Sequence, residues 1–349
     1  MKILMGVQAT GNGHITRARA MSAAFSTRGI DVDYVFSGRD PEQLFDMDMF
    51  GDYRCFNGLT FVTEAGSVKP LATVKKNSLR QLYRDICAID LSAYDLVITD
   101  FEPITAWAAK RQKKMSIAIG HQNAFDYAIP KKGSNPAVQL FMNYFAPAKV
   151  RLGLHWHHFE QPILPPIADV KHDSAKTIKN KIVVYLGFEQ KEQVIEWLRP
   201  FTDYEFYIYA DFVCAEDQEN LHLRPLSRDG FKEDLSTCNG VISNAGFELA
   251  SEAIQLGKKI LVKPLKGQME QISNALALEK LSLGMEMTHL DSVVLRRWLD
   301  HFDGKQVIYP DVVAAIADWI VQQEFNDVTP LVNSLWSQVK SPDIPHFSD

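Results

Sequence analysis

The sequence predicts an α/β protein with two domains, each built on a doubly wound parallel sheet that helices cover on both faces. Short continuous apolar segments alternate with segments of helical periodicity, and this alternation restarts near the middle of the chain. Between the two series lies the segment 161–166 (QPILPP), in which three prolines exclude a helix and favour an extended connection. A chain of 349 residues is long enough to form two hydrophobic cores.

In the first half, four apolar runs are predicted to be strands, and the periodic segments among them to be helices. The strands are residues 3–7, 32–36, 96–99 and 115–119, and the helices are 15–28, 70–88 and 103–112. These elements form an expected first domain of residues 1–161.

The second half repeats this order of elements. Strands are predicted at 182–186, 205–209, 240–243 and 259–262, and helices at 190–198, 231–236, 248–255 and 271–279. We assign a linker to residues 162–169 and a second domain to 170–309. The tail 310–349 contains helical spacing at 312–322 and 331–339, and its length suits helices that cross back to the first domain.

The composition excludes several classes of protein. Hydrophobic residues make up 46% and charged residues 23%, as in soluble globular proteins, and no apolar run is long enough to span a bilayer. No export signal opens the chain, and the four cysteines have no paired spacing, so we expect a cytoplasmic protein without disulfides or a zinc site. The first half is net basic and the second net acidic, which indicates either different partners or chance; we expect no nucleic-acid partner.

A glycine loop follows the first predicted strand. Gly11 and Gly13 allow close approach of the backbone to a ligand, and His14 stands at the start of the next helix. A dinucleotide fingerprint would require a third glycine where Thr16 stands, so we discount NAD. His14 could remove a proton from a hydroxyl at neutral pH, or it could cap the loop or bind a phosphate.

Two further polar motifs follow strands of the first domain. Asp100 and Glu102 come after strand 96–99, and His121-Gln122-Asn123 come after strand 115–119. Because parallel strands end at the same edge of a sheet, we expect these side chains near the glycine loop. One carboxylate could orient His14, replace it as the base or bind an acceptor, and Asp100 could instead cap the helix that begins near Pro103.

The second domain carries the most informative segment, residues 244–274. A turn at Gly246 leads into a helix that bears Glu252, a buried strand follows, and a polar loop then opens another helix. A diphosphate can bind at the positive end of the first helix, and Glu252 can accept hydrogen bonds from ribose hydroxyls.

This segment resembles the donor-binding region of GT-B glycosyltransferases, notably the bacterial peptidoglycan N-acetylglucosaminyltransferase and plant-type UDP-glycosyltransferases. By this resemblance, Gly187, at the end of the first strand of the second domain, lies where a glycine loop approaches the pyrophosphate, and polar residues bind the phosphates, ribose and sugar. The implied donor-binding residues are Gly11, Gly13, Gly187, Asn244, Gly246, Glu252, Gln268, Glu270, Gln271 and Asn274. Gly13-His14 matches a Gly-Gly-His of the peptidoglycan enzyme, which implies His14 as the base.

The chain departs from these relatives at several positions. Asn244 replaces a phosphate-contacting histidine, and Leu249 replaces a serine. Phe188-Glu189 replace small residues, and Glu189 would repel a diphosphate unless it binds a sugar or points away. His121-Gln122-Asn123 are one residue shorter than the His-Glu-Gln-Asn of the peptidoglycan enzyme, so the acceptor that they bind is open.

The predicted function is transfer of a sugar from a UDP-sugar to a hydroxyl acceptor, with inversion and with His14, Asp100 or Glu102 as the base. The nucleotide-sugar is a substrate, and the scheme needs no cofactor and no metal. A UDP-sugar 2-epimerase of the same fold and a non-catalytic sugar-nucleotide-binding protein are the alternatives. The acceptor could be a glycan, a lipid or a small molecule.

Two surface features remain open at this level. Lys76, Arg80 and Arg84 recur on one face of the predicted helix 70–88, which is either a solvated face or a peripheral contact with an anionic membrane. The histidines of the segment 155–158 (HWHH) favour a role in the core or at the hinge over a metal site, because no further ligand is spaced for zinc.

Overall fold

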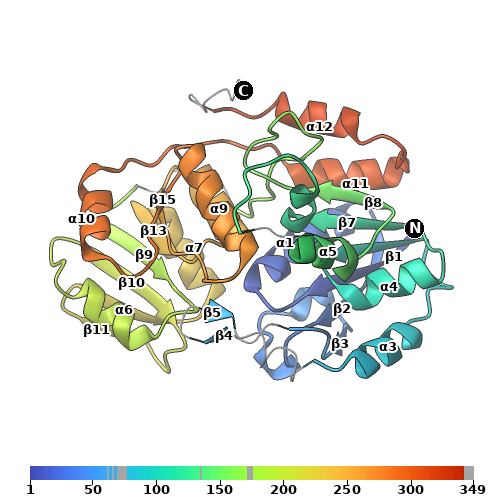
Figure 1. The fold of residues 1–349 in the computed structure, drawn as a ribbon, viewed down its shortest axis with the longest axis horizontal. Helices are drawn as coiled ribbons and strands as arrows, with labels where there is room; N and C mark the ends of the chain where they lie inside the picture. The colour runs from blue at the N-terminus through green and yellow to red at the C-terminus, as the bar shows by residue number, and fades with distance from the viewer. Residues whose placement is uncertain (61–62, 65–66, 69–76, 134–135, 171–175, 342–349) are drawn as a thin grey trace.

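The computed structural model forms two lobes that lie side by side (Figure 1). It describes the chain except for residues 61–62, 65–66, 69–76, 134–135, 171–175 and 342–349. The part of the predicted helix 70–88 that carries Lys76 therefore lies outside the described residues.

The first lobe contains a six-stranded sheet in which every neighbouring pair is parallel. Its order is β3-β2-β1-β6-β7-β8. The strands are β1 (Lys2–Gln8), β2 (Asp31–Ser37), β3 (Arg54–Phe56), β6 (Leu96–Asp100), β7 (Ser116–Gly120) and β8 (Val150–Gly153). A separate hairpin joins β4 (Thr63–Glu64) to β5 (Ser67–Val68). All five residues of both β6 and β7 are buried, which explains their continuous apolar sequence.

Helices cover both faces of this sheet. They are α1 (Asn12–Thr27), α3 (Leu79–Ala88), α4 (Pro103–Arg111) and α5 (Pro136–Phe145), with short 3-10 turns η1 (Pro41–Gln43), η2 (Asp48–Phe50) and η3 (His121–Asp126). Ser78 caps α3 by accepting a hydrogen bond from the Gln81 N–H, which fixes the start of this helix. Leu79, the first residue of this helix, is 74% exposed.

The second lobe repeats the strand order of the first. Its sheet is β11-β12-β10-β9-β13-β14-β15, parallel except for β11, which adds an antiparallel edge. The strands are β9 (Lys181–Tyr185), β10 (Glu205–Ala210), β11 (Glu216–Gln218), β12 (Leu221–Pro225), β13 (Gly240–Ser243), β14 (Lys259–Val262) and β15 (Met285–Glu286). In both sheets the order of the strands reverses next to the first strand, between β1 and β6 and between β9 and β13. Ligands of open α/β sheets usually bind at such a topological switch point.

The helices of the second lobe are α6 (Lys191–Leu198), α7 (Arg228–Thr237), α8 (Phe247–Gln255), α9 (Met269–Lys280) and α10 (Ser292–His301). Two more follow, α11 (Val312–Gln322) and α12 (Thr329–Trp336), and Figure 1 shows them over the first lobe. Arg28, which ends α1, forms an ion pair with Asp318 of α11. The tail therefore packs on the first lobe.

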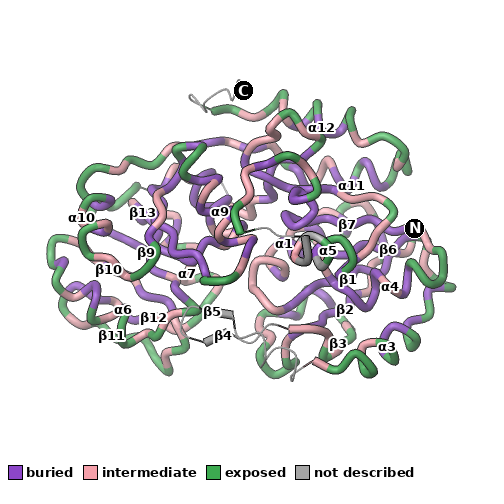
Figure 2. Tube along the Cα trace, in the orientation of Figure 1, coloured by how far each residue is buried: buried purple, intermediate pink, exposed green. Residues whose placement is uncertain are grey.

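The largest hydrophobic cluster joins the two lobes at the hinge side. It includes Trp156, Phe247 and Ile316, and central strands of both lobes, among them β6 and β13, are buried along their length (Figure 2). The Trp156 Nε1–H donates to Ser251 Oγ at 2.9 Å, and the ring of the buried His155 packs edge-on against Phe159. The prediction of two doubly wound α/β domains is confirmed.

Candidate active site

Helix α1 begins at a glycine, which has no side chain to cap the first N–H groups of the helix. This N-cap residue is Gly11, and among the described residues no atom lies within 4 Å of the position a Cβ would take. The N–H groups of this turn are therefore free for a ligand. His14 and Arg17 follow three residues apart, so they lie on one face of the helix.

His14, Asp100 and Arg17 form one hydrogen-bonded cluster. His14 Nδ1 lies 2.7 Å from Asp100 Oδ1, and the Arg17 guanidinium donates from Nε to Oδ2 and from Nη2 to Oδ1, both at 2.7 Å. Asp100 is fully buried and Arg17 is 2% exposed, whereas the His14 side chain is 14% exposed. With Nδ1 directed to the carboxylate, His14 Nε2 is the nitrogen available to a substrate hydroxyl.

The charges of this cluster stabilise one another. Burial alone would raise the pKa of Asp100, but Arg17 and His14 hold it at about 2, so the carboxylate is ionised. Burial alone would lower the pKa of His14, but the Asp100 carboxylate outweighs that effect and raises it above its usual 6.5. His14 is thus oriented and made more basic by Asp100, which are two properties that a general base requires.

Two carboxylates of the second lobe reach this cluster. Glu248, in the first turn of α8, forms an ion pair with Arg17 Nη1. Glu270, in the first turn of α9, accepts from the Gln122 amide at 3.2 Å. The site is therefore assembled from both lobes.

The structure assigns different positions to the two carboxylates of the segment 100–102. Glu102, and not Asp100, caps α4: its oxygens accept from the N–H groups of Ile104 and Thr105. They also accept from the hydroxyls of Thr105 and Ser37. Because Glu102 is fully buried and bonded to these four donors, it lies away from His14 and has no free oxygen for a substrate proton.

The predicted acceptor-side residues point in different directions. His121 is buried, stacks on Phe247 of α8 at 4.0 Å, and its Nε2 lies 2.6 Å from Asn274 Oδ1, so it braces the two lobes. Burial lowers the pKa of His121 to about 4, which leaves the ring neutral. Asn123 is turned to Leu152 and Arg151 of β8, whereas buried Gln122 Oε1 has no hydrogen-bond partner among the described residues.

The donor-side helix α8 begins in the same way as α1. Gly246 is its N-cap residue and supplies no side-chain cap, and in the described part of the chain nothing lies within 4 Å of a Cβ placed there. Glu252 is 7% exposed, and burial raises its pKa to about 8. It lines a cavity of about 150 Å³ between the lobes. The lining residues are Asn12, Gly13, Thr16, Arg19, Phe45, Tyr185, Tyr209, Leu226, Ser227, Arg228, Phe231, Lys232, Glu248, Leu249 and Glu252.

The departures near Gly187 form a self-consistent local structure. Asn244 is 8% exposed, donates to the Lys263 carbonyl at 3.0 Å and accepts from the Phe188 N–H at 3.4 Å, so it holds the loop after β9 in place. Glu189 pairs with Lys263 Nζ at 2.6 Å. This ion pair removes the repulsion expected between Glu189 and a bound diphosphate.

The predicted polar residues at the start of α9 are not among those that line the cavity between the lobes. Gln271 accepts from the Leu265 N–H at 2.8 Å, and Asn274 donates to the Ala245 carbonyl at 3.0 Å, so both are buried inside the protein framework. Gln268 Oε1 has no hydrogen-bond partner among the described residues. Of this predicted set, Gln268 and Glu270 remain the residues with atoms to offer a ligand.

Sequence reasoning did not select Arg17 or Glu248. The three-residue spacing from His14 indicated that Arg17 shares its helix face, and Glu248 lies one turn before Glu252. Their pairing joins positions 231 apart in the chain, for which one sequence contains no signal.

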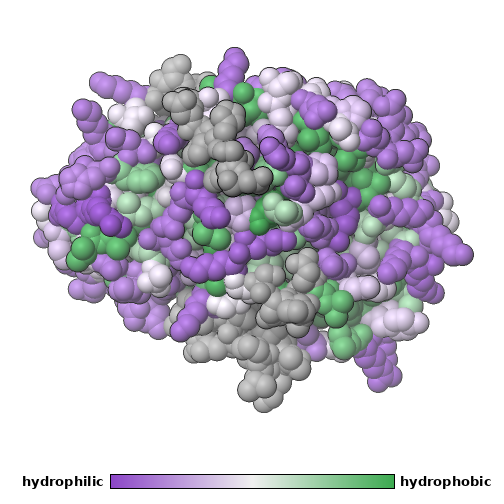
Figure 3. All heavy atoms as spheres, turned by 45° about the horizontal axis from the view of Figure 1, so that its top comes forward, coloured by the Kyte–Doolittle hydropathy of each residue, from purple (hydrophilic) through white to green (hydrophobic). Residues whose placement is uncertain are grey.

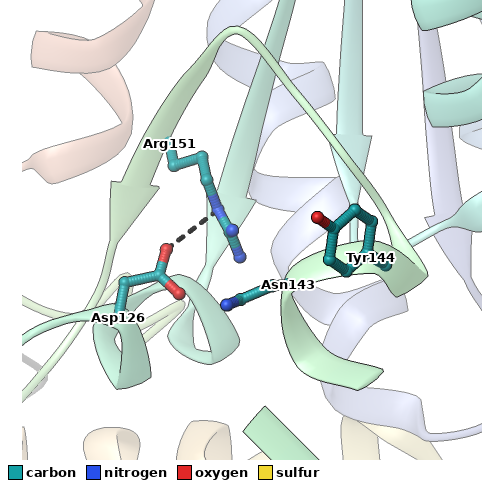
Figure 4. Close-up of a pocket in the computed structure, with 4 residues that line it drawn as sticks. All are labelled: Asp126, Asn143, Tyr144 and Arg151. Carbon is teal, nitrogen blue, oxygen red and sulfur yellow. Dashed lines mark ion pairs between the residues drawn. The ribbon is translucent and has the colours of Figure 1, made fainter. Parts of the chain in front are cut away.

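A second hollow of about 430 Å³ lies on the first lobe, lined by Asp126, Asn143, Tyr144 and Arg151 (Figure 4). The Arg151 Nε–H donates to Asp126 Oδ2 at 3.0 Å across it. None of its lining residues belongs to the His14 cluster or to the cavity between the lobes.

The surface shows no dominant apolar face in the view of Figure 3, where hydrophilic side chains surround small hydrophobic areas. In the part of the chain that the structure describes, no helix has both the length and the apolar character to cross a membrane. Among the same residues, no group of three or more His, Cys, Asp or Glu side chains is placed to hold a metal ion.

Comparison with known proteins gives a family and a fold. The sequence model of glycosyl transferase family 1 matches residues 1–302. A search of curated proteins finds no match.

Among solved structures, the chain is similar to the glycosyltransferase SnogD from Streptomyces nogalater, with 16% identity, a TM-score of 0.54 and coverage of 97% of this chain and 99% of that one. It is also similar to the spinosyn rhamnosyltransferase SpnG complexed with spinosyn aglycone, with 13% identity, a TM-score of 0.58 and coverage of 96% and 100%. The glycosyltransferase VinC in complex with DTDP matches at 13% identity, with a TM-score of 0.53 and coverage of 97% and 99%. At these identities the structures show a shared GT-B fold.

Proposed function

Because the chain belongs to glycosyl transferase family 1, we propose that it moves a sugar from a UDP-sugar, held by the second lobe, to a hydroxyl of an acceptor held by the first. The finer resemblance to the peptidoglycan and plant-type enzymes, and the transfer of a hexosyl or N-acetylhexosaminyl group, are part of this proposal.

The observation that carries the proposal is the pair of uncapped helix starts beside a buried carboxylate. Helices α1 and α8 both begin at a glycine with open space beside its Cα, and Glu252 lies in the second turn of α8. Uncapped N–H groups and two helix dipoles favour a diphosphate, and Glu252 would accept from the ribose hydroxyls. Tyr209 and Phe231, which also line the cavity, offer an aromatic surface against which the nucleobase of the donor would stack.

The size of the cavity supports a hinge motion during binding. Its volume of about 150 Å³ is below the ~300–1,000 Å³ of sites that enclose small molecules. A nucleotide-sugar would therefore enter when the lobes separate, and their closure over it would exclude water that hydrolyses the donor.

In the proposed reaction, His14 Nε2 removes the proton of the acceptor hydroxyl. The acceptor oxygen then bonds to the anomeric carbon as the bond from that carbon to the phosphate oxygen breaks, which inverts the configuration. The nucleoside diphosphate leaves with the bonding electrons, and the N–H groups at the start of α8 stabilise its charge. The scheme uses no cofactor and no metal.

The nucleobase admits one specific second candidate. VinC was solved with DTDP and SpnG with thymidine diphosphate, so a TDP-sugar is the alternative donor for this fold. TDP lacks the ribose 2′-hydroxyl, so a carboxylate that binds both ribose hydroxyls would favour UDP. Glu252 is the residue that would make this choice.

Fewer contacts support the proposed binding site for the acceptor. Gln122 Oε1 is buried without a partner among the described residues and could accept from an acceptor hydroxyl. SpnG is described as binding an aglycone, which motivates a small hydroxylated molecule as the first acceptor to test, beside glycans and lipids.

A peripheral membrane contact is a separate proposal. Arg80 and Arg84 lie on the exposed side of α3 together with Leu79 and Tyr83, which are 74% and 66% exposed. Cations beside apolar groups favour an anionic lipid surface. Co-sedimentation with anionic and with neutral liposomes tests this; no binding to anionic liposomes at low salt would exclude it.

The direct test of the function is a thermal-shift screen with UDP, TDP, GDP and their sugar conjugates. A ligand that binds the folded form raises the melting temperature, and we expect UDP and UDP-sugars to give the largest rise, reduced in Glu252→Gln. A protein that no nucleotide or nucleotide-sugar stabilises would overturn the proposal. Production of an epimer from the UDP-sugar alone would favour the epimerase.

A further inference from the structure

The guanidinium of Arg17 is shared between the two lobes. Its Nε and Nη2 donate to Asp100 of the first lobe, and its Nη1 pairs with Glu248 of the second. Arg17 is 2% exposed, and the Glu248 side chain is 17% exposed. An ion pair this sheltered from water is weakly screened, so its formation changes the field at neighbouring groups.

The local backbone is shaped for this pairing. A Cβ on Gly13 would lie 2.7 Å from Glu248 Oε2, so any larger residue there would displace the Glu248 carboxylate from its place beside the start of α1. The same carboxylate stands in the first turn of α8, near the proposed diphosphate site, where an unpaired negative charge would oppose binding.

We propose that Glu248 is a positioning residue that couples closure of the lobes to the His14–Asp100 pair through Arg17. The inference rests on the proposed function in that His14 is taken as the base. When the lobes separate, Asp100 and Arg17 compensate each other. When they close, Glu248 adds a negative charge on the side of Arg17 that faces away from Asp100. Arg17 then compensates less of the charge of Asp100, and the Asp100 carboxylate interacts more strongly with His14.

The groups that face His14 all enter this balance. Asp100 and Glu248 raise the pKa of His14, and Arg17, whose Nη2 lies 3.1 Å from His14 Nδ1, lowers it. Glu270 of α9 and His121 of η3 also interact electrostatically with His14. Of these groups, Glu248 and Glu270 belong to the second lobe, and Glu248 is the one bonded to Arg17.

The test is a histidine NMR titration of the free protein, in which the His14 signal is identified by its loss in His14→Asn. We expect Glu248→Gln to lower the pKa of His14, because it removes a nearby negative charge. Glu192→Gln is the matched control: Glu192 lies in the first turn of α6, is exposed, and should leave His14 unchanged.

A second variant keeps the proposal falsifiable if Glu248→Gln folds poorly. Glu248→Asp retains the charge, so His14 should keep more than half of the shift that the glutamate provides. An unchanged His14 titration in Glu248→Gln, or a Glu248→Asp value as low as that of Glu248→Gln, would overturn the coupling.

This measurement needs no substrate, so it separates the two proposals. A shift of His14 in a protein that uses no nucleotide-sugar would contradict the proposed function and support the coupling. Sugar transfer with an unmoved His14 would do the opposite. In an active enzyme, the acid limb of the kcat–pH profile should move in Glu248→Gln by the same amount as the NMR pKa.

Discussion

Helices α1 and α8 occupy equivalent places in the cleft but carry opposite charges into it. Each begins at a glycine without a side-chain cap. Helix α1 presents His14 and Arg17, whereas α8 presents Glu248 and Glu252. The two helices therefore attract each other across the cleft. The fold gives the two lobes the same geometry, and the charges of the side chains make the lobes different.

The difference also separates chemistry from binding. On the α1 side, the charged groups are paired: Asp100 serves both His14 and Arg17. On the α8 side, Glu252 has an elevated pKa because burial and not a partner dominates its environment. We infer that the first lobe orients His14 as the base before a substrate binds, and that Glu252 of the second lobe binds the ribose.

The largest expected effect is on turnover. His14→Ala should lower kcat by about 10²–10⁴-fold, the usual contribution of a general base, while nucleotide affinity stays within about twofold. Steady-state kinetics and calorimetric titration measure the two quantities, with the exposed His289→Ala as control. Equal turnover in His14→Ala would show that α1 does not carry the chemistry.

A large effect on stability should follow from Arg17→Met. This change leaves the buried Asp100 without its guanidinium partner, which typically costs about 3–5 kcal/mol. Arg28→Met is a matched control on the same chain segment, because the Arg28–Asp318 pair is more exposed, with Asp318 57% exposed, and should contribute at most about 1 kcal/mol. Denaturant unfolding compares them; similar losses would mean that the cluster contributes no more than a surface pair.

The sequence predicted the central strands of both sheets, because buried parallel strands are continuous apolar runs, but it did not predict the short outer strands such as β3, β8 and β15. It also placed His14 and Asp100 at one sheet edge, as their 2.7 Å contact requires. It did not assign α10, although Asp291 caps it and Leu295, Trp298 and Leu299 are buried on one face. Nor did it assign β12, whose run of alternating apolar and polar residues ends at Pro225.

The polar residues were harder because a side chain can serve the framework or a ligand at the same position. Asp100 is the residue that the sequence offers as a cap for the helix near Pro103, but the structure shows that Glu102 caps it and that Asp100 bonds His14. Gln271 and Asn274 were predicted from a resemblance, but their buried hydrogen bonds lie with Leu265 and Ala245. Such choices depend on atoms that only the folded chain brings together.

A moderate effect should appear in the pH dependence of nucleotide binding. The pKa of Glu252 is about 8, so at pH 6 the group is protonated and one of its oxygens carries the proton. Only the ionised form can accept from both ribose hydroxyls with its two oxygens. Affinity for UDP should rise by up to about tenfold per pH unit from pH 6 to 8 and level off above. Titration calorimetry measures this, and Glu252→Gln should bind weakly with little pH dependence.

The raised pKa of Glu252 also makes the free energy of unfolding depend on pH. Its pKa is raised by folding from 4.5 to about 8, so the unfolded chain loses this proton first as the pH rises. The stability associated with the neutral acid is present below pH 4.5 and is lost progressively up to about pH 8. Glu252→Gln should reduce this decline in the unfolding free energy, and an unaltered decline would place the titration elsewhere.

The smallest expected effect tests the contact between the two helices directly. Alanine is ordinarily favoured over glycine inside a helix by roughly 0.5–1 kcal/mol, but at Gly13 the added methyl group would meet Glu248 Oε2 at 2.7 Å. Gly13→Ala should therefore bring no gain in the wild-type background and should recover that gain when Glu248 is also alanine. A double-mutant cycle measures the difference, and strictly additive effects would mean that the start of α1 and the first turn of α8 do not touch in solution.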